Sequence, residues 1–109
     1  MKREIIAELE GTVGARNVLS AAEDLVLYEY DGSVEKARPE VVVFPSNTAD
    51  VVKIVKLAIK HDVAIVGRGA GTGLSGGALA RGGGMMLAFG RMNKILELDY
   101  GNRRAVVQP

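Results

Sequence analysis

The sequence contains no cysteine and only one histidine, His61, among its 109 residues. Without cysteine, the chain forms no disulfide, no thiolate metal site and no cysteine nucleophile. A single histidine also excludes a histidine-rich metal site, so we predict no metal ligand here. No pair of carboxylates and no base–nucleophile arrangement stands out, so we also predict no catalytic residue in this stretch.

Long apolar runs and a strong charge of one sign are absent too. No run approaches the roughly 18 residues that span a bilayer, and no apolar signal region follows Met1 to Glu4. The 14 basic and 13 acidic residues are interspersed, with a net charge of +1, which leaves no footprint for nucleic acid. We therefore expect a cytoplasmic chain of at most one domain, with no transmembrane segment and no nucleic-acid partner.

Glycine, in contrast, is abundant and concentrated. Nine of the 14 glycines lie between Gly67 and Gly84. Each glycine inside a regular element costs about 0.5–1 kcal/mol relative to alanine, so packing alone does not explain the cluster. Bare backbone, positive φ angles or the close approach of a ligand would explain it. Because successive backbone N–H groups form an anion-binding concavity, the expected ligand is a phosphate or pyrophosphate.

The remaining pattern predicts an α/β fold. Short β-branched and apolar runs are typical of strands buried on both faces, and the stretch from Ala49 to His61 has a helical period after a capping Asn47 or Thr48. The expected elements are a helix over 3–10 ended by Gly11 and Gly14, an ambiguous stretch over 17–24, strands over 41–44, 63–66 and 85–89, a helix over 49–61, and a hairpin of 95–99 with 103–108. Strand, helix and strand at this spacing form a small parallel βαβ unit. Apolar and acidic residues alternate over 95–99, which predicts a half-buried strand.

Three phosphate-binding templates can be compared with the glycine-rich stretch. A P-loop needs a Lys-Ser or Lys-Thr pair that closes the turn, and none is present. The pattern G-x-G-x-x-G does occur at Gly71–Gly76, but in a Rossmann fold it opens a helix, and residues 76–84 are too rich in glycine for one. An irregular loop that cradles the anion fits best, with hydroxyl donors on Thr72 and Ser75. A glycine-rich turn without a ligand remains the alternative.

Several stretches together resemble the FAD-binding domain of the vanillyl-alcohol oxidase and p-cresol methylhydroxylase flavoproteins. They are Tyr28-Glu29-Tyr30-Asp31-Gly32, Val43-Phe44-Pro45-Ser46, Asp50 to Lys56, Gly67 to Ala78, and Arg91-Met92-Asn93-Lys94-Ile95. Within that superfamily, the sequence is most similar to the branch of the glycolate oxidase flavoprotein subunit and the D-lactate dehydrogenases.

The resemblance implies that residues 1–109 are the N-terminal subdomain of a two-part FAD-binding domain. Residues 1–33 would be a helical lead-in, and residues 40–109 the βαβ unit with its glycine-rich loop and hairpin. The remainder of the enzyme would lie outside these residues. The implied cofactor-binding residues are Pro45, Arg68, Gly69, Ala70, Gly71, Thr72, Gly73, Ser75, Gly76, Gly77 and Ala78.

The resemblance also implies a role for each of these residues. Gly69 to Gly73 would offer N–H groups to the pyrophosphate, and Thr72 and Ser75 would add side-chain contacts. Gly76 to Ala78 would continue along the cofactor, and Pro45 would lie near its adenine end. For Arg68 two roles stay open: it pairs with phosphate, or it braces the loop through a carboxylate.

The implied cofactor is FAD, bound non-covalently. Some relatives tether the flavin through a histidine in this loop, but Thr72 stands near that position here, and we expect His61 to be a surface or helix-capping residue. The implied enzyme oxidises a 2-hydroxy acid such as glycolate or D-lactate, has partner subunits, and is cytoplasmic or peripheral to the inner face of the membrane. We expect the 109 residues alone to be inactive and to self-associate. The alternative is a stand-alone, non-catalytic nucleotide-binding or assembly module.

Overall fold

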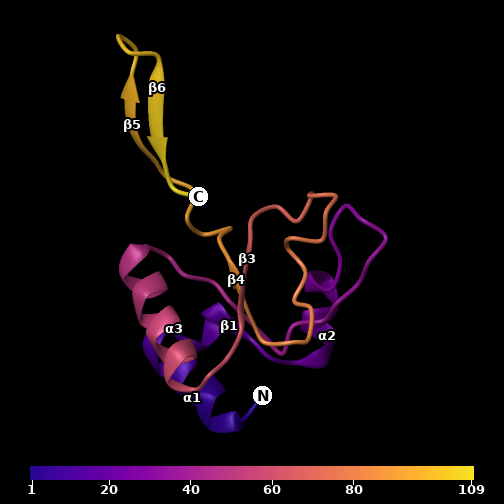
Figure 1. Cartoon of the computed structure of the whole chain (residues 1–109). Coiled ribbons are helices and arrows are strands. Elements are labelled where there is room, and N and C mark those ends of the chain that lie inside the picture. The colour runs from indigo at the N-terminus through magenta and orange to yellow at the C-terminus, as the bar shows by residue number, and fades with distance from the viewer.

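A computed structural model describes residues 1–109 and shows an α/β body from which a two-stranded hairpin projects (Figure 1). The elements are α1 (Arg3–Val13), a 3₁₀ turn (Ala15–Asn17), β1 (Val18–Leu19), α2 (Ala22–Leu25), a second 3₁₀ turn (Val26–Tyr28), β2 (Val41–Val43), α3 (Thr48–Lys60), β3 (Ile65–Arg68), β4 (Met85–Ala88), β5 (Ile95–Asp99) and β6 (Arg104–Val107). The predicted α/β class, with a parallel unit and an antiparallel hairpin, is confirmed.

The body contains one four-stranded sheet in the order β1-β2-β4-β3. Strands β2 and β3 both run parallel to β4, which lies between them. The predicted βαβ unit is therefore parallel, although its two strands are not neighbours. The short strand β1 pairs antiparallel with β2 through Val18 and Val43, so the lead-in expected over residues 1–33 also contributes to the sheet.

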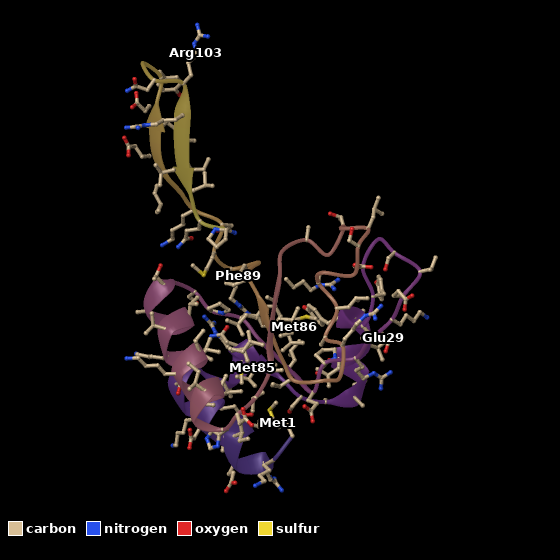
Figure 2. The ribbon with its side chains drawn as sticks, in the orientation of Figure 1. Met1, Glu29, Met85, Met86, Phe89 and Arg103 are labelled. Carbon is tan, nitrogen blue, oxygen red and sulfur yellow. The ribbon has the colours of Figure 1, made fainter.

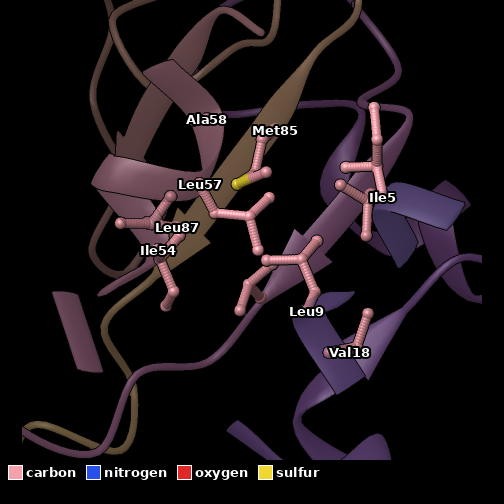
Figure 3. Packing of buried hydrophobic residues seen from close by; sticks show 10 residues of the cluster. Ile5, Leu9, Val18, Ile54, Leu57, Ala58, Met85 and Leu87 are labelled. Atoms are coloured by element: carbon pink, nitrogen blue, oxygen red, sulfur yellow. The ribbon is translucent and has the colours of Figure 1, made fainter. Parts of the chain in front are cut away.

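Alternate residues of the central strands face opposite sides of this sheet. Val41, Val43, Met85 and Leu87 pack with Leu9 and other residues of α1 and α3 in one cluster (Figure 3). On the other side, a smaller cluster forms around three residues of the same strands, Val42, Met86 and Ala88. Strands β2 and β4 are thus buried on both faces, as their continuous apolar sequences predict.

The helices differ from their predicted bounds mainly at α1. This helix continues past Gly11, where a Cβ would have no atom from outside the helix backbone within 4 Å, and ends at Val13, with Gly14 as its C-cap residue at a φ of +93°. Helix α3 begins at the predicted cap, because Oδ1 of Asn47 accepts a 2.9 Å hydrogen bond from the backbone N–H of Asp50. His61 is its C-cap residue, and the ring Nε2 lies 3.3 Å from Oε2 of Glu8 on α1.

The hairpin β5–β6 forms where the sequence predicts it, but the expectation that 95–99 is half-buried is wrong. Both strands are exposed, and the hairpin extends away from the body with Arg103 at its tip (Figures 1 and 2). Ile95 pairs with Val107 and Leu98 pairs with Ala105, so these four residues lie on one face of the hairpin, and a bulge between Ile95 and Glu97 inserts the exposed Leu96 into β5. We call these five residues, Ile95, Leu96, Leu98, Ala105 and Val107, the apolar hairpin face.

Two further features bear on the sequence-based expectations. None of the helices has both the length and the apolar character needed to traverse a bilayer. No three histidine, cysteine or acidic side chains gather in a way that could hold a metal ion. Three methionines contribute to the buried core, since Met85 and Met86 have no exposed surface and Met92 is 4% exposed.

Candidate functional site

The carboxyl ends of three parallel strands lie at one edge of the sheet. Residues Phe44, Gly69 and Phe89 follow β2, β3 and β4 there. A hollow of about 340 Å³ at this edge is lined by residues that include Gly69, Phe89, Asn93 and Pro109. Ligands of open α/β sheets bind outside the carboxyl ends of the strands, so this edge is the expected position for a site.

A slightly larger hollow, of about 380 Å³, lies at the opposite edge, where the strands begin. Its walls include Met1, Glu40, His61 and Gly84. The backbone N–H of Gly84 already donates to Oε2 of Glu40 at 2.8 Å. This second hollow therefore lacks the free backbone donors of the glycine-rich loop, and we place the candidate site at the carboxyl edge.

The backbone N–H groups of the glycine-rich loop are free. From Gly69 to Ala78, no N–H donates to a backbone acceptor or forms a hydrogen bond with a side chain. Gly71 and Gly76 have φ angles of +72° and +75°, so the backbone turns there and its consecutive N–H groups no longer alternate between opposite sides as they do in a strand. A row of free donors around such turns is the kind of concavity that binds anions.

Three glycines of this loop have no packing reason to be glycine. No atom lies within 4 Å of where a Cβ would stand on Gly69, Gly73 or Gly77. All three are exposed. Space on the bare side of these residues is therefore available for close approach by a molecule from outside the chain, as FAD pyrophosphate requires.

The two predicted hydroxyl donors are available as well. Thr72 and Ser75 are exposed, and neither hydroxyl forms a hydrogen bond within the chain. Ala70 is exposed next to them, and Ala78 is half-buried where the loop returns to the body. The residue types and their freedom fit a phosphate group, whose oxygens accept hydrogen bonds.

Of the two roles that the sequence left open for Arg68, the structure bears on the brace through a carboxylate, and pairing with phosphate stays a prediction. Its Nη1 donates a 2.8 Å hydrogen bond to the backbone oxygen of Tyr30, and its Cζ lies 5.7 Å from the ring centroid of Tyr28. The residue is only 7% exposed and has no carboxylate partner. The expectation of a brace through a carboxylate is therefore wrong: Arg68 braces the loop through a carbonyl oxygen and an aromatic ring.

Pro45 lies at the predicted edge of the sheet but is not open to a ligand. It follows β2 and is fully buried in the body. Next to it, the ring of Phe44 is covered by the guanidinium of Arg91, with Cζ 5.4 Å from the ring centroid. In this structure, Pro45 shapes the end of β2 and offers no side-chain surface to a cofactor.

The segment Asp31–Ser33 packs on the glycine-rich loop. None of its three residues is among the cofactor-binding residues predicted from the sequence. The N–H of Gly32 donates to the oxygen of Gly73 at 2.8 Å. A Cβ on Gly32 would stand 2.6 Å from the oxygen of Thr72, so only glycine permits this approach. The turn Asp31-Gly32-Ser33 is visible in the sequence, but nothing local indicates which distant loop it contacts.

Asp31 is the acidic residue of this contact. Oδ1 accepts hydrogen bonds from the N–H and hydroxyl of Ser33 at 2.8 and 2.5 Å. The hydroxyl, then the N–H, hold the pKa of Asp31 below its ordinary 3.8. The N–H of Gly76 also faces the carboxylate and lowers that pKa, but without hydrogen-bond geometry, so the buried Oδ2 has no partner in the chain.

These features define a nucleotide-binding α/β module: a parallel sheet with a cradle of free backbone donors at the carboxyl ends of its strands. The comparison with protein families specifies it further. The FAD binding domain family matches residues 39–109, and the chain belongs to this family.

The most similar relatives in sequence include two glycolate oxidase subunits GlcD. That of Bacillus subtilis is 35% identical over 108 residues, and that of Escherichia coli K12 is 38% identical over 109. The alignments include 98% and 99% of this chain, but only 23% and 22% of those relatives. A D-lactate dehydrogenase of Anaerostipes hadrus is 46% identical over 67 residues, which are 62% of this chain and 14% of that protein.

Solved structures show the same fold. Alkyldihydroxyacetonephosphate synthase has a TM-score of 0.86 at 22% identity, over 99% of this chain and 24% of its own. p-Cresol methylhydroxylase has a TM-score of 0.74 at 24% identity, over 88% of this chain and 20% of its own. Together with the family match over residues 39–109 and the similarity to the glycolate oxidase subunits, this shared fold confirms the resemblance to the vanillyl-alcohol oxidase and p-cresol methylhydroxylase type of FAD-binding domain.

Proposed function

We propose that the loop from Gly69 to Ala78 binds the pyrophosphate of FAD non-covalently. The observation that carries this proposal is the row of free N–H groups in that loop, beside three glycines whose bare side faces open space. The proposed donors to the phosphate oxygens are the backbone N–H groups of Gly69 to Gly73 and the hydroxyls of Thr72 and Ser75. Hydrogen bonds to a charged acceptor are about twice as strong as neutral ones. Membership of the FAD binding domain family supports FAD over other nucleotides.

Non-covalent binding is part of the same proposal. A covalent tether needs a nucleophilic side chain close to the flavin, and the loop carries no histidine or cysteine. His61 lies at the opposite edge of the sheet, beside Glu8, in the hollow away from the loop. The chain therefore holds the cofactor through hydrogen bonds and electrostatics alone.

The proposed activity is that of a larger FAD-linked oxidoreductase that oxidises a 2-hydroxy acid. The bound flavin supplies the two-electron chemistry. The residues described here bind and orient the pyrophosphate. None of them forms the acid–base or substrate-clamping arrangement of a complete active site. The names glycolate oxidase subunit and D-lactate dehydrogenase among the relatives support this substrate class, and the word subunit supports an assembly with partners.

Nuclear magnetic resonance tests the pyrophosphate site directly. In a ¹⁵N-labelled 109-residue chain, we expect FAD and ADP to shift the amide signals of Gly69 to Ala78 with a Kd near about 1 mM, because one loop supplies only a few kcal/mol of binding energy. Riboflavin, which has no phosphate, is expected to leave them unchanged. Shifts elsewhere only, or equal shifts with riboflavin, would contradict the proposal.

A pair of glycine variants provides the control for that experiment. Gly73→Val places a side chain in the open space of the cradle and is expected to abolish the ADP-induced shifts. Gly11→Val adds the same side chain in α1, also with no atom within 4 Å of its Cβ, and should leave the shifts intact. If both variants bind ADP equally, the loop is not the binding site.

A further inference from the structure

Arg68 carries a buried positive charge directly beneath the glycine-rich loop. An arginine side chain stays protonated at any pH at which the protein folds. Here it is 7% exposed, and its partners are the oxygen of Tyr30 and the ring of Tyr28. Burial of a charge without an opposite charge is costly. An anion bound above the loop would reduce this cost.

The guanidinium also occupies the space beside the bare Cα of Gly71. A Cβ on Gly71 would stand 2.5 Å from Cζ and 2.9 Å from Nε of Arg68. The absence of a side chain at Gly71 therefore has a cause inside the chain, in contrast to Gly69, Gly73 and Gly77. Arg68 is thus held between the aromatic ring of Tyr28 and the backbone of the loop.

The same guanidinium joins the loop to the segment that packs on it. Its hydrogen bond to Tyr30 lies two residues before Gly32, whose N–H holds the oxygen of Gly73. Two contacts between segments about 40 positions apart in sequence therefore flank the turn at Gly71: Arg68 with Tyr30 before it, and Gly73 with Gly32 after it. Since almost no other hydrogen bond restrains the loop, these two contacts set its shape.

We propose that Arg68 is a positioning residue, which holds the pyrophosphate loop in its binding shape from beneath and does not itself contact phosphate. The proposal rests on the proposed function of the loop. The positive charge of Arg68 attracts the pyrophosphate through the loop, while the planar guanidinium group, with its fixed hydrogen-bond donors, determines the shape of the loop. A lysine at this position would retain the positive charge. It would lack the planar guanidinium that stacks on the ring of Tyr28 and donates to the oxygen of Tyr30.

Hydrogen exchange of the Gly32 amide in the ligand-free chain tests the positioning role. We expect Arg68→Met to accelerate this exchange by about tenfold or more, the effect of losing a hydrogen bond to a charged group. Gly71→Ala should do the same with the arginine still present, because the added methyl displaces the guanidinium. Arg91→Met, which removes the other arginine that stacks on an aromatic ring at this edge, should leave the Gly32 exchange rate unchanged.

Binding of ADP separates positioning from direct contact. We expect Arg68→Lys to bind ADP more tightly than Arg68→Met, yet to exchange its Gly32 amide as fast. Unchanged exchange together with lost ADP binding in Arg68→Met would make Arg68 a phosphate ligand and overturn the proposal.

If Arg68→Met does not fold, Tyr28→Leu removes one wall of the stack without leaving the charge unbonded, and unchanged Gly32 exchange in that variant overturns it equally. A wild-type chain that binds no ADP refutes the proposed function, while the exchange data still decide the role of Arg68.

Discussion

Glu40 and Gly84 hold each other by two hydrogen bonds at the beginning of the central strands. The N–H of Glu40 donates to the oxygen of Gly84 at 2.9 Å, and the N–H of Gly84 donates to Oε2 of Glu40 at 2.8 Å. This pair lies just before the first paired residues of β2 and β4, Val41 and Met85. The pair therefore aligns β2 and β4, whose opposite, carboxyl ends lie at the candidate site. Two predictions depend on this pair.

Gly84→Ala is expected to destabilise the protein. Gly84 has a φ of +91°, and an added Cβ would stand 2.7 Å from the backbone oxygen of Ala64, which cannot move aside. A strained backbone of this kind costs about 1–3 kcal/mol, so urea denaturation should show at least that loss in the free energy of unfolding. Gly90→Ala is the control, because nothing lies within 4 Å of its Cβ, and it should change stability by less than about 0.5 kcal/mol. Equal denaturation midpoints for the two variants would contradict the prediction.

The stabilising effect of Glu40 should depend on pH. The Met1 ammonium, and then the N–H of Gly84, hold the pKa of Glu40 below its ordinary 4.5. A carboxyl group whose pKa is lower in the folded state stabilises the fold fully above the unfolded-state pKa, and this contribution is lost as the pH falls through the folded-state pKa.

The variant Glu40→Gln measures this contribution. Urea denaturation should show the wild type to be more stable than the variant at pH 7, with a difference that shrinks steadily as the pH falls below about 5. A difference that stays constant from pH 7 to pH 3 would mean that the charge of Glu40 contributes nothing.

Asn47→Ala is expected to cost about 1 kcal/mol of unfolding free energy, because it removes the side-chain acceptor for the N–H of Asp50 at the start of α3. Asn47→Asp retains such an acceptor and should recover most of the loss. Thermal unfolding followed by circular dichroism measures both. Asn93→Ala, in an exposed turn where the side chain forms no hydrogen bond, is the matched control. A loss in Asn93→Ala as large as that in Asn47→Ala would refute the capping role.

The apolar hairpin face is expected to cause self-association of the 109-residue chain. Leu96 on this face is 61% exposed, and no other part of the chain covers it. Sedimentation velocity should show a weight-average mass that increases with concentration, and Leu96→Lys should reduce the increase. Ile59→Lys replaces an equally exposed apolar residue on α3, 73% exposed, and should not. A monomer at every concentration would show that the hairpin face does not associate.

Much of the fold could be predicted from local patterns. The period of 3.6 over residues 49–61, with Asn47 before it, corresponds to α3 within one residue at each end. The continuous apolar run at Val41–Val43 predicts burial on both faces, and all three residues have no exposed surface. Strand β1 could not be predicted, because two residues carry no pattern and are a strand only through pairing with β2.

The candidate site was predictable in kind but not in its connections. The density of glycine, with Thr72 and Ser75 among them, indicates a loop of free donors, because backbone freedom and donor groups are properties of the residues themselves. The partner of Arg68 was not predictable, because the oxygen of Tyr30 is one of many acceptors, and the fold alone brings it to the guanidinium.

The sequence by itself therefore determined the α/β class, the family and the loop that can receive a pyrophosphate. These depend on periodicity, glycine content and short motifs, which are local. Only the tertiary structure decided that β4 lies between β2 and β3, that Gly32 packs on Gly73, and that the hairpin face is exposed. Such contacts join residues about 20 to about 40 positions apart, and their free energy depends on the packing of the whole chain, to which no single stretch of sequence corresponds.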